Sequence, residues 1–253
     1  MIEIINFLKF YYRLLRQNLL DQIFKEKSEI PSALLRKRVH GSFCPESYLQ
    51  VGENIFQDLL NLSKLNTKFD HKILDFGCGP GRIARNFFQQ GVFVYGTDID
   101  EQAINYCKKN FPNGDWCVNE WTPPFKYKSN FFDFIYSVSV FTHINQELQR
   151  KWLKEVSRIL KPDGIAVVSI HGKNCFGKLN REEISLINDT GFYFKTGNRG
   201  ILKTDGLPDE YQTSYQTVNY TKREWMKYFD FVDVCECGIG NHQDAVILKK
   251  PLH

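Results

Sequence analysis

The chain has 253 residues, of which 42% are hydrophobic and 15% aromatic, enough apolar material to bury one domain of ordinary size. This composition excludes disordered, collagen-like and tandem-repeat proteins. The net charge of +4 resides in residues 1–40, where eight basic residues stand against four acidic ones, and the charges of the remaining chain cancel. Because the main body carries no excess of positive charge, we expect no nucleic-acid partner.

Seven cysteines are scattered along the chain, and no two of them form a C-x-x-C pair. Their odd number and irregular spacing favour a reducing compartment and argue against structural zinc, so we expect no bound metal. The first segment, MIEIINFLKFYYRLLRQ, mixes charged residues into an apolar stretch and lacks a small-residue cleavage site. It therefore fits neither a signal peptide nor a spanning helix, and we expect a soluble, cytoplasmic protein.

Apolar residues recur at three- and four-residue spacing over the first 24 residues, which predicts an amphipathic helix with one apolar stripe. The stripe comprises Ile5, Leu8, Tyr12, Leu15, Leu19 and Ile23. We expect this stripe to be buried against the main domain. A basic amphipathic helix can also lie on an acidic membrane surface, an alternative that we place behind burial. With a second helix over residues 48–62, residues 1–65 form a predicted helical cap or lid.

From Lys72 onward, short apolar runs such as KILDF and VFVYGTD alternate with helical patterns such as RIARNFF and EQAINYCKKN. Strands and helices in alternation predict crossover connections and a parallel sheet with helices on both faces. We therefore expect residues 66–253 to form a doubly wound, Rossmann-like α/β core with a mostly parallel seven-stranded sheet. The alternation lapses after His171, and residues from about 172 to 220 form a predicted insertion on the acceptor side.

A buried strand, ILDF, ends in three alternating glycines, Gly77, Gly79 and Gly81, and leads directly into a helix. Glycines allow a sharp turn and a close approach to a ligand, and the free N–H groups at a helix start favour an anionic group. Asp98 closes the next strand, where an acid can accept hydrogen bonds from both hydroxyls of a ribose. Loop and acid together predict a ligand that contains a nucleoside. The spacing is G-x-G-x-G rather than G-x-G-x-x-G, and the bulky Arg82 follows, which disfavours a dinucleotide.

Several motifs, in this order along the chain, resemble those of class I S-adenosylmethionine-dependent methyltransferases. DFGCGPGR resembles the first motif, YGTDID the ribose-binding acid, and FFDFIYSVSVFTHI with RILKPDG the fourth strand and the turn before the fifth. The resemblance covers about residues 51–170. The flanking segments resemble a bacterial subgroup associated with glycan and natural-product modification, whose acceptor is unassigned. The resemblance implies S-adenosylmethionine as the cofactor and methyl transfer as the activity.

The same resemblance assigns roles around the cofactor. The glycine loop would surround the methionyl half, Asp98 would hold the ribose, and Ile99 would pack against adenine. Asn119 stands where the family reaches the adenine amino group, Trp121 would add an apolar wall, and Ser137 would contact both cofactor and acceptor. The implied cofactor-binding residues are Asp75, Gly77, Gly79, Gly81, Asp98, Ile99, Asn119, Trp121 and Ser137.

An alcohol acceptor must lose its proton during methyl transfer, and histidine is the natural base near neutral pH. His143 follows the predicted fourth strand and His171 ends the fifth, at the same sheet edge. Either can instead be a loop histidine bonded to the backbone, and of the two we favour His143 as the catalytic residue. Hydrogen-bonding and aromatic side chains that suit a polyhydroxylated acceptor, or equally a polar surface loop, are Tyr211, Gln212, Tyr215, His242 and Gln243.

Together these patterns predict an enzyme that transfers a methyl group from S-adenosylmethionine to a hydroxyl oxygen of a small-molecule or glycan acceptor. Two alternatives stay open. One is a binding protein that retains the cofactor site without turnover, and the other is a NAD-dependent oxidoreductase. The sequence leaves the oligomeric state open.

Overall fold

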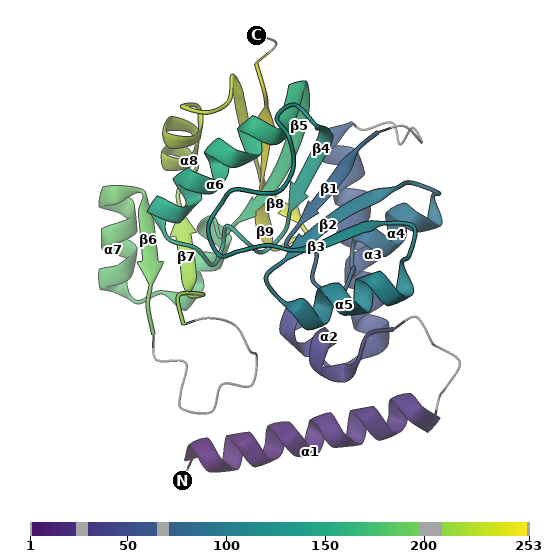
Figure 1. The fold of residues 1–253 in the computed structure, drawn as a ribbon. Helices are drawn as coiled ribbons and strands as arrows, with labels where there is room; N and C mark the ends of the chain where they lie inside the picture. Colours follow the sequence, from purple (N-terminus) through teal and green to yellow (C-terminus); the bar gives the residue numbers. More distant parts are fainter. Residues whose placement is uncertain (1, 24–29, 65–70, 198–208, 252–253) are drawn as a thin grey trace.

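The computed structural model describes residues 2–23, 30–64, 71–197 and 209–251 (Figure 1). The predicted boundary between cap and core, at residues 65 and 66, falls at a segment outside these ranges. Within the described helices, none is both long and apolar enough to cross a membrane.

A seven-stranded sheet forms the centre of the molecule, with the strand order β3-β2-β1-β4-β5-β9-β8. Strands β1 to β5 pair in parallel, and β9 runs antiparallel to both β5 and β8. The strands are β1 Ile73–Phe76, β2 Val94–Asp98, β3 Asp115–Val118, β4 Phe132–Ser137, β5 Leu160–Ile170, β8 Phe231–Ile239 and β9 Gln243–Lys249. The prediction of a doubly wound, mostly parallel seven-stranded sheet is confirmed.

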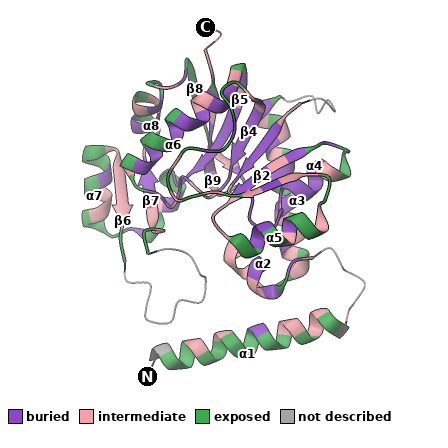
Figure 2. Cartoon of the chain, viewed as in Figure 1, coloured by how far each residue is buried: buried purple, intermediate pink, exposed green. Residues whose placement is uncertain are grey.

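Helices cover both faces of this sheet, which is why its central strands are apolar at successive positions. Ile73 packs on the face covered by α3, α4 and α5, whereas its neighbour Leu74 packs on the face covered by α6 and α8 (Figure 2). Both side chains are completely buried. These helices are α3 Pro45–Ser63, α4 Ala84–Gln89, α5 Glu101–Asn110, α6 Gln146–Ile159 and α8 Val218–Trp225.

The predicted insertion contains elements of its own beside the carboxyl end of β5. A two-stranded antiparallel sheet lies next to a 3₁₀ helix and one α-helix, around a small separate apolar cluster that includes Cys175, Ile187 and Tyr215. The elements are η1 Lys173–Lys178, α7 Arg181–Thr190, β6 Phe192–Lys195 and β7 Thr213–Gln216.

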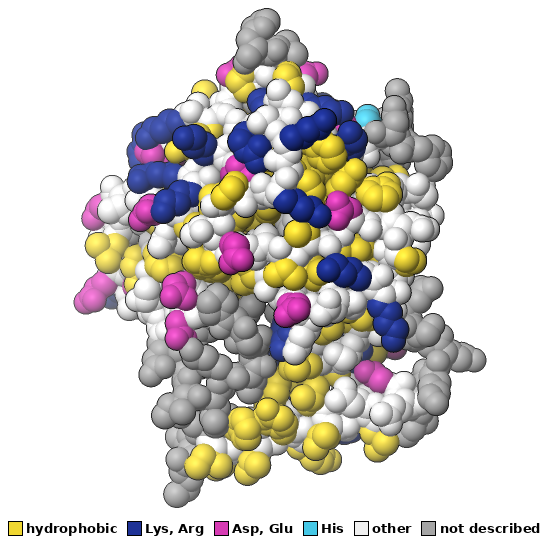
Figure 3. Space-filling model, in the orientation of Figure 1, with side chains coloured by type: hydrophobic (Ala, Val, Ile, Leu, Met, Phe, Trp, Pro, Cys, Tyr) yellow, Lys and Arg dark blue, Asp and Glu magenta, His cyan; other side chains and the backbone are white. Residues whose placement is uncertain are grey.

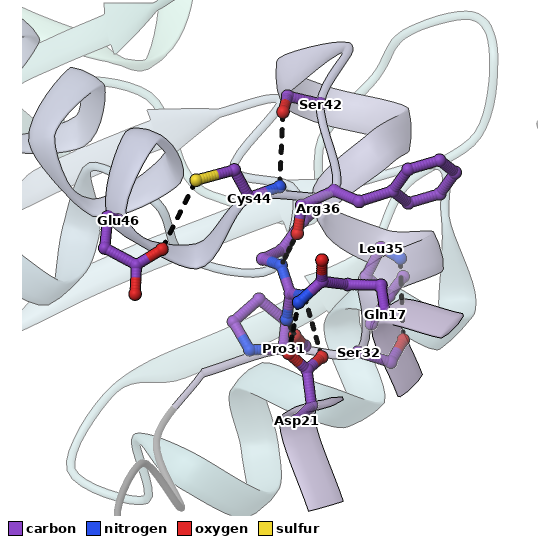
Figure 4. Close-up of polar contacts among 10 residues, drawn as sticks. Gln17, Asp21, Pro31, Ser32, Leu35, Arg36, Ser42, Cys44 and Glu46 are labelled. Atoms are coloured by element: carbon purple, nitrogen blue, oxygen red, sulfur yellow. Dashed lines mark hydrogen bonds and ion pairs between the residues drawn. The ribbon is translucent and has the colours of Figure 1, made fainter. Parts of the chain in front are cut away.

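Two further helices, α1 Ile2–Ile23 and α2 Ala33–His40, precede the core. The guanidinium of Arg36, only 1% exposed, joins them: it pairs with Asp21 at 2.7 Å and donates to the carbonyls of Pro31 at 2.6 Å and Phe43 at 2.7 Å (Figure 4). Phe10 also contacts Phe43, with ring centroids 5.6 Å apart. These contacts hold α1 against α2 and the chain that follows it.

The expectation that the apolar stripe of the first helix is buried is wrong. Leu8, Tyr12, Leu15 and Leu19 are between 58% and 69% exposed, and Ile5 is 43% exposed. The side chain of Ile23 lies outside the described residues. The reason is that another side of α1 faces α2 and the segment after it. On that side, Phe10 packs on the ring of Phe43, Asp21 pairs with the buried guanidinium of Arg36, and Leu14 is only 9% exposed.

Candidate functional site

A cavity of about 230 Å³ lies at the carboxyl edge of the parallel strands. Its walls come from the glycine loop after β1, the residues that follow β2, β3 and β4, the end of α2, and Tyr211. In doubly wound sheets this edge is where ligands bind, because the crossover helices leave a crevice there. Among the described residues, no group of three or more His, Cys, Asp or Glu side chains is placed to hold a metal ion.

The glycine loop forms the floor of this cavity. Gly77 and Gly79 line it with φ angles of +82° and +51°, a backbone region that residues with a Cβ rarely adopt. A Cβ on Gly77 would collide with Cγ2 of Val140, and one on Gly79 would lie 2.7 Å from Cγ1 of Val39. Both glycines therefore let the backbone itself face a ligand. Gly81 has φ +73° but does not line the cavity.

The Asp98 carboxylate faces this loop from the end of β2. Its Oδ2 accepts a hydrogen bond from the Gly79 N–H at 2.7 Å, and its Oδ1 accepts one from the Asp100 N–H at 2.8 Å. Burial raises the pKa of Asp98 from 3.8 to about 6, and the hydrogen bonds from Asp100 and Gly79 oppose that rise. The group is therefore mostly ionised at neutral pH, and it is a strong acceptor on the cavity wall.

Two of the predicted cofactor residues lie behind the cavity wall rather than on it. Asp75 is 2% exposed and accepts a hydrogen bond from the Tyr136 hydroxyl at 2.9 Å. Burial raises the pKa of Asp75 to about 8, against the lowering effect of that hydrogen bond. Ser137 is completely buried, and its hydroxyl donates to the Phe76 carbonyl at 3.0 Å. Both residues fix the ends of β1 and β4.

Ile99, Asn119 and Trp121 form one side of the cavity. The Asn119 N–H donates to the Asp98 carbonyl at 3.0 Å, which holds the ends of β2 and β3 together. The side-chain Nδ2 donates to the Glu120 carbonyl at 2.8 Å, whereas Oδ1 is buried and has no hydrogen-bond partner among the described residues. A buried acceptor without a donor costs about 1–3 kcal/mol. This wall therefore fits a flat ligand that donates an N–H, as the amino group of adenine does.

His143 lines the cavity in the segment that follows β4. Its Nδ1 lies 2.7 Å from the Gln212 carbonyl. Because a carbonyl only accepts, Nδ1 carries the proton and the lone pair of the neutral ring is on Nε2. The ring of Tyr211, another cavity residue, stacks on the imidazole with centroids 4.2 Å apart, and its hydroxyl donates to the Ser139 carbonyl at 3.2 Å. The imidazole is thus held in one orientation.

His171 does not line the cavity. It is 8% exposed, and its Nδ1 lies 3.1 Å from the Ser214 carbonyl. Burial, together with the charge of the nearby His143, lowers the pKa of His171 to about 4. The ring is therefore neutral at neutral pH, with its centroid 6.0 Å from that of His143. Of the two candidate bases, only His143 is on the cavity wall.

Four of the predicted acceptor-binding residues do not line the cavity: Gln212, Tyr215, His242 and Gln243. Gln212 accepts from the Gly197 N–H at 3.0 Å within its own loop. Tyr215, in β7, is 3% exposed and belongs to the small apolar cluster of the insertion. Gln243 donates to the Ser139 hydroxyl at 3.0 Å. From this predicted group, Tyr211 alone reaches the wall in the part of the chain that the structure describes.

The sequence analysis missed the contribution of α2. Arg38 and Val39 line the cavity, and Arg38 pairs with Asp100 at 2.8 Å. Its Nε is buried and, within the described ranges, has no hydrogen-bond partner. Arg82 also lines the cavity, with Nη1 at 3.5 Å from Nδ1 of His40. Arg38 and Asp100 are about sixty residues apart in the sequence, so residue spacing left this pairing unspecified.

Comparisons with known proteins show what the chain is similar to. A family model described as a methyltransferase domain matches residues 74–168. The chain is 30% identical to an uncharacterized protein of Methanocaldococcus jannaschii, over 64% of this chain and 66% of the relative. It is 28% identical to a ubiquinone biosynthesis O-methyltransferase of Pelagibacter ubique, over 52% of this chain and 55% of the relative. The chain thus spans between half and two thirds of the length of these two relatives.

Solved structures show the same fold. A S-adenosylmethionine-dependent methyltransferase of Methanosarcina mazei superposes with a TM-score of 0.54 at 19% identity, covering 77% of this chain and 98% of that one. This agreement concerns the fold alone. Residues 74–168 belong to the methyltransferase-domain family, and the chain has the class I fold of S-adenosylmethionine-dependent methyltransferases.

Proposed function

We propose that this protein transfers a methyl group from S-adenosylmethionine to a hydroxyl oxygen of a small-molecule or glycan acceptor. The observation that supports this most strongly is one cavity that is lined by Asp98, Asn119 and His143 together. The O-methyltransferase of Pelagibacter ubique, which is 28% identical, supports oxygen as the acceptor atom.

Three residues would hold the adenosyl group. Asp98 would accept hydrogen bonds from the ribose hydroxyls, Asn119 would accept one from the adenine amino group, and Ile99 would pack beside the base. Gly77 and Gly79 allow the methionyl half to approach the backbone at the start of the loop. When bound, S-adenosylmethionine supplies a methyl carbon that is already activated by the sulfonium.

The protein then has two tasks, alignment of the acceptor and removal of its proton. The lone pair on Nε2 of His143 accepts the proton that the hydroxyl loses, while Tyr211 and the Gln212 carbonyl keep the imidazole oriented. Val140, Ile144 and Trp152 are apolar cavity residues, and they exclude water from the reacting atoms.

The test is transfer of tritium from labelled S-adenosylmethionine to a panel of sugar nucleotides, glycolipids and small alcohols. For the accepted compound, His143→Gln should lower kcat at least about 100-fold, the range of a lost general base, and leave the affinity for S-adenosylhomocysteine within about twofold. His71→Gln is the matched control, because His71 precedes β1, at the opposite edge of the sheet, and lies outside the cavity. Undiminished turnover of His143→Gln would remove His143 from the mechanism.

The same panel separates the two alternatives. A non-catalytic binding protein would be stabilised against heat by S-adenosylhomocysteine and would transfer no label to any compound. A NAD-dependent oxidoreductase would instead be stabilised by NAD. We expect stabilisation by S-adenosylhomocysteine alone, together with label transfer.

A further inference from the structure

The helix α1 presents an apolar face to solvent. Ile4, Leu8, Tyr12, Leu15 and Leu19 are each between 58% and 69% exposed, and apolar side chains run along this helix in Figure 3. Single exposed apolar residues are common on soluble proteins, but a continuous row along a helix marks a docking surface. We call these five residues the outer face of α1.

The outer face is held outward by contacts on the opposite side of the helix. Leu14 is 9% exposed, Phe10 packs on Phe43, and Asp21 pairs with Arg36. Because Arg36 is 1% exposed and also bonded to two backbone carbonyls, rotation of α1 would leave a buried charge without its partner. Burial of the outer face therefore requires something outside the described chain.

Charge indicates what this occupant is. Lys9, Arg13 and Arg16 are exposed, and Lys9 and Arg16 stand three residues before and four residues after Tyr12, so they border the outer face. Among the side chains described for α1, Asp21 is the single acidic one, and it is turned inward to Arg36. A second copy of the helix would bring the same basic border, Lys9 and Arg16, against the first. An anionic surface is complementary to both the apolar row and the basic border.

We propose that α1 docks the protein on an anionic lipid surface, with the outer face in the interfacial region and Lys9, Arg13 and Arg16 at the headgroups. The helix lies on this surface rather than across it. The proposal does not depend on methyl transfer, because vesicle binding is measured without S-adenosylmethionine.

The test is sedimentation of the full chain at low salt with vesicles of equal parts phosphatidylcholine and phosphatidylglycerol, compared with vesicles of phosphatidylcholine alone. We expect binding to the mixed vesicles, at least about tenfold weaker binding to the neutral ones, and loss of binding at high salt. Leu8→Gln combined with Leu15→Gln should weaken binding at least about 100-fold, because two leucines no longer leave water. Lys9→Gln combined with Arg16→Gln should weaken it about 30-fold.

Controls use the same substitutions on other surfaces. Leu186→Gln removes a leucine of α7 that is 51% exposed, and Lys108→Gln with Lys109→Gln removes an exposed basic pair of α5. Both variants should bind the mixed vesicles as the wild type does. Absence of binding to mixed vesicles at low salt would overturn the proposal, as would equal binding to neutral vesicles or unchanged binding of both α1 variants. Concentration-dependent dimers that Leu8→Gln with Leu15→Gln dissociates, without vesicle binding, would show that a second copy covers the outer face instead.

Discussion

Substitution of Asp98 by asparagine removes one charge from the cavity wall and changes almost nothing in volume. The carboxylate accepts from the Gly79 N–H at 2.7 Å and the Asp100 N–H at 2.8 Å, and in the proposed complex it also accepts from the ribose hydroxyls. An amide keeps one acceptor oxygen and turns the other into a donor, so at least one hydrogen bond to a charged group is lost. Such a bond contributes about 1.5–3 kcal/mol. The dissociation constant for S-adenosylhomocysteine should therefore rise about 10- to 150-fold.

The assay is calorimetric titration with S-adenosylhomocysteine at slightly alkaline pH, where Asp98, with a pKa of about 6, is ionised. Glu101→Gln is the matched control: it removes an exposed carboxylate in the first turn of α5, outside the cavity, and should leave the affinity unchanged. Thermal unfolding of both variants confirms that they are folded. An affinity of folded Asp98→Asn within about twofold of the wild type would refute the assignment of Asp98 to the ribose.

Three further outcomes follow from the same contacts. The affinity for S-adenosylhomocysteine should be constant above about pH 6 and fall by up to about tenfold per pH unit below it, as Asp98 is protonated, which calorimetry across pH checks. Gly77→Ala should lose binding of S-adenosylhomocysteine and about 1–2 kcal/mol of stability, because φ is +82° and the new Cβ would collide with Cγ2 of Val140. Gly177→Ala is the control, since a Cβ there would have no atom within 4 Å, and urea titrations of both variants measure the difference. Burial raises the pKa of Asp75 from 3.8 to about 8, so the folded protein keeps a proton that the unfolded chain releases, and the free energy of unfolding falls by about 1.4 kcal/mol per pH unit between these values. Asp75→Asn should remove this contribution, so between about pH 5 and about pH 7 its free energy of unfolding should fall by less than that of the wild type in urea unfolding.

The fold could be predicted from the sequence because the alternation of strands and helices is repeated and unambiguous. Ile73 and Leu74 illustrate the reason, since a strand with two apolar neighbours in succession requires cover on both faces, and both side chains are fully buried. The glycine spacing and the acid at the end of the second strand likewise specify a loop and a carboxylate at one edge. Both lie on the wall of the same cavity.

The orientation of individual side chains was harder to predict. Tyr211 and Gln212 are adjacent in sequence, and either side chain suits a binding site. Tyr211 lines the cavity, whereas the side chain of Gln212 accepts a hydrogen bond from the Gly197 N–H. A resemblance of motifs also does not specify depth: Asp75 and Ser137 stand at family positions, yet both side chains are buried behind the cavity wall. These distinctions depend on backbone geometry that residue spacing does not encode.

Contacts between distant segments were not predictable from periodicity. α1 has two apolar rows, and the choice between them depends on Arg36 and Phe43, which lie beyond the helix itself. The pairing of Arg38 with Asp100 likewise joins α2 to the start of α5. Local pattern predicted the helix over the first 24 residues and the helix of EQAINYCKKN, but not α2. Tertiary partners determined which face of α1 is covered.

A crystal structure of the protein with S-adenosylhomocysteine would examine the proposed cofactor site itself. We expect the ribose hydroxyls within hydrogen-bond distance of the Asp98 carboxylate, the adenine amino group on Oδ1 of Asn119, and the sulfur on the side of the cavity that His143 occupies. Adenosyl density at another surface, or a ribose turned away from Asp98 in this cavity, would contradict the proposed reading of the site.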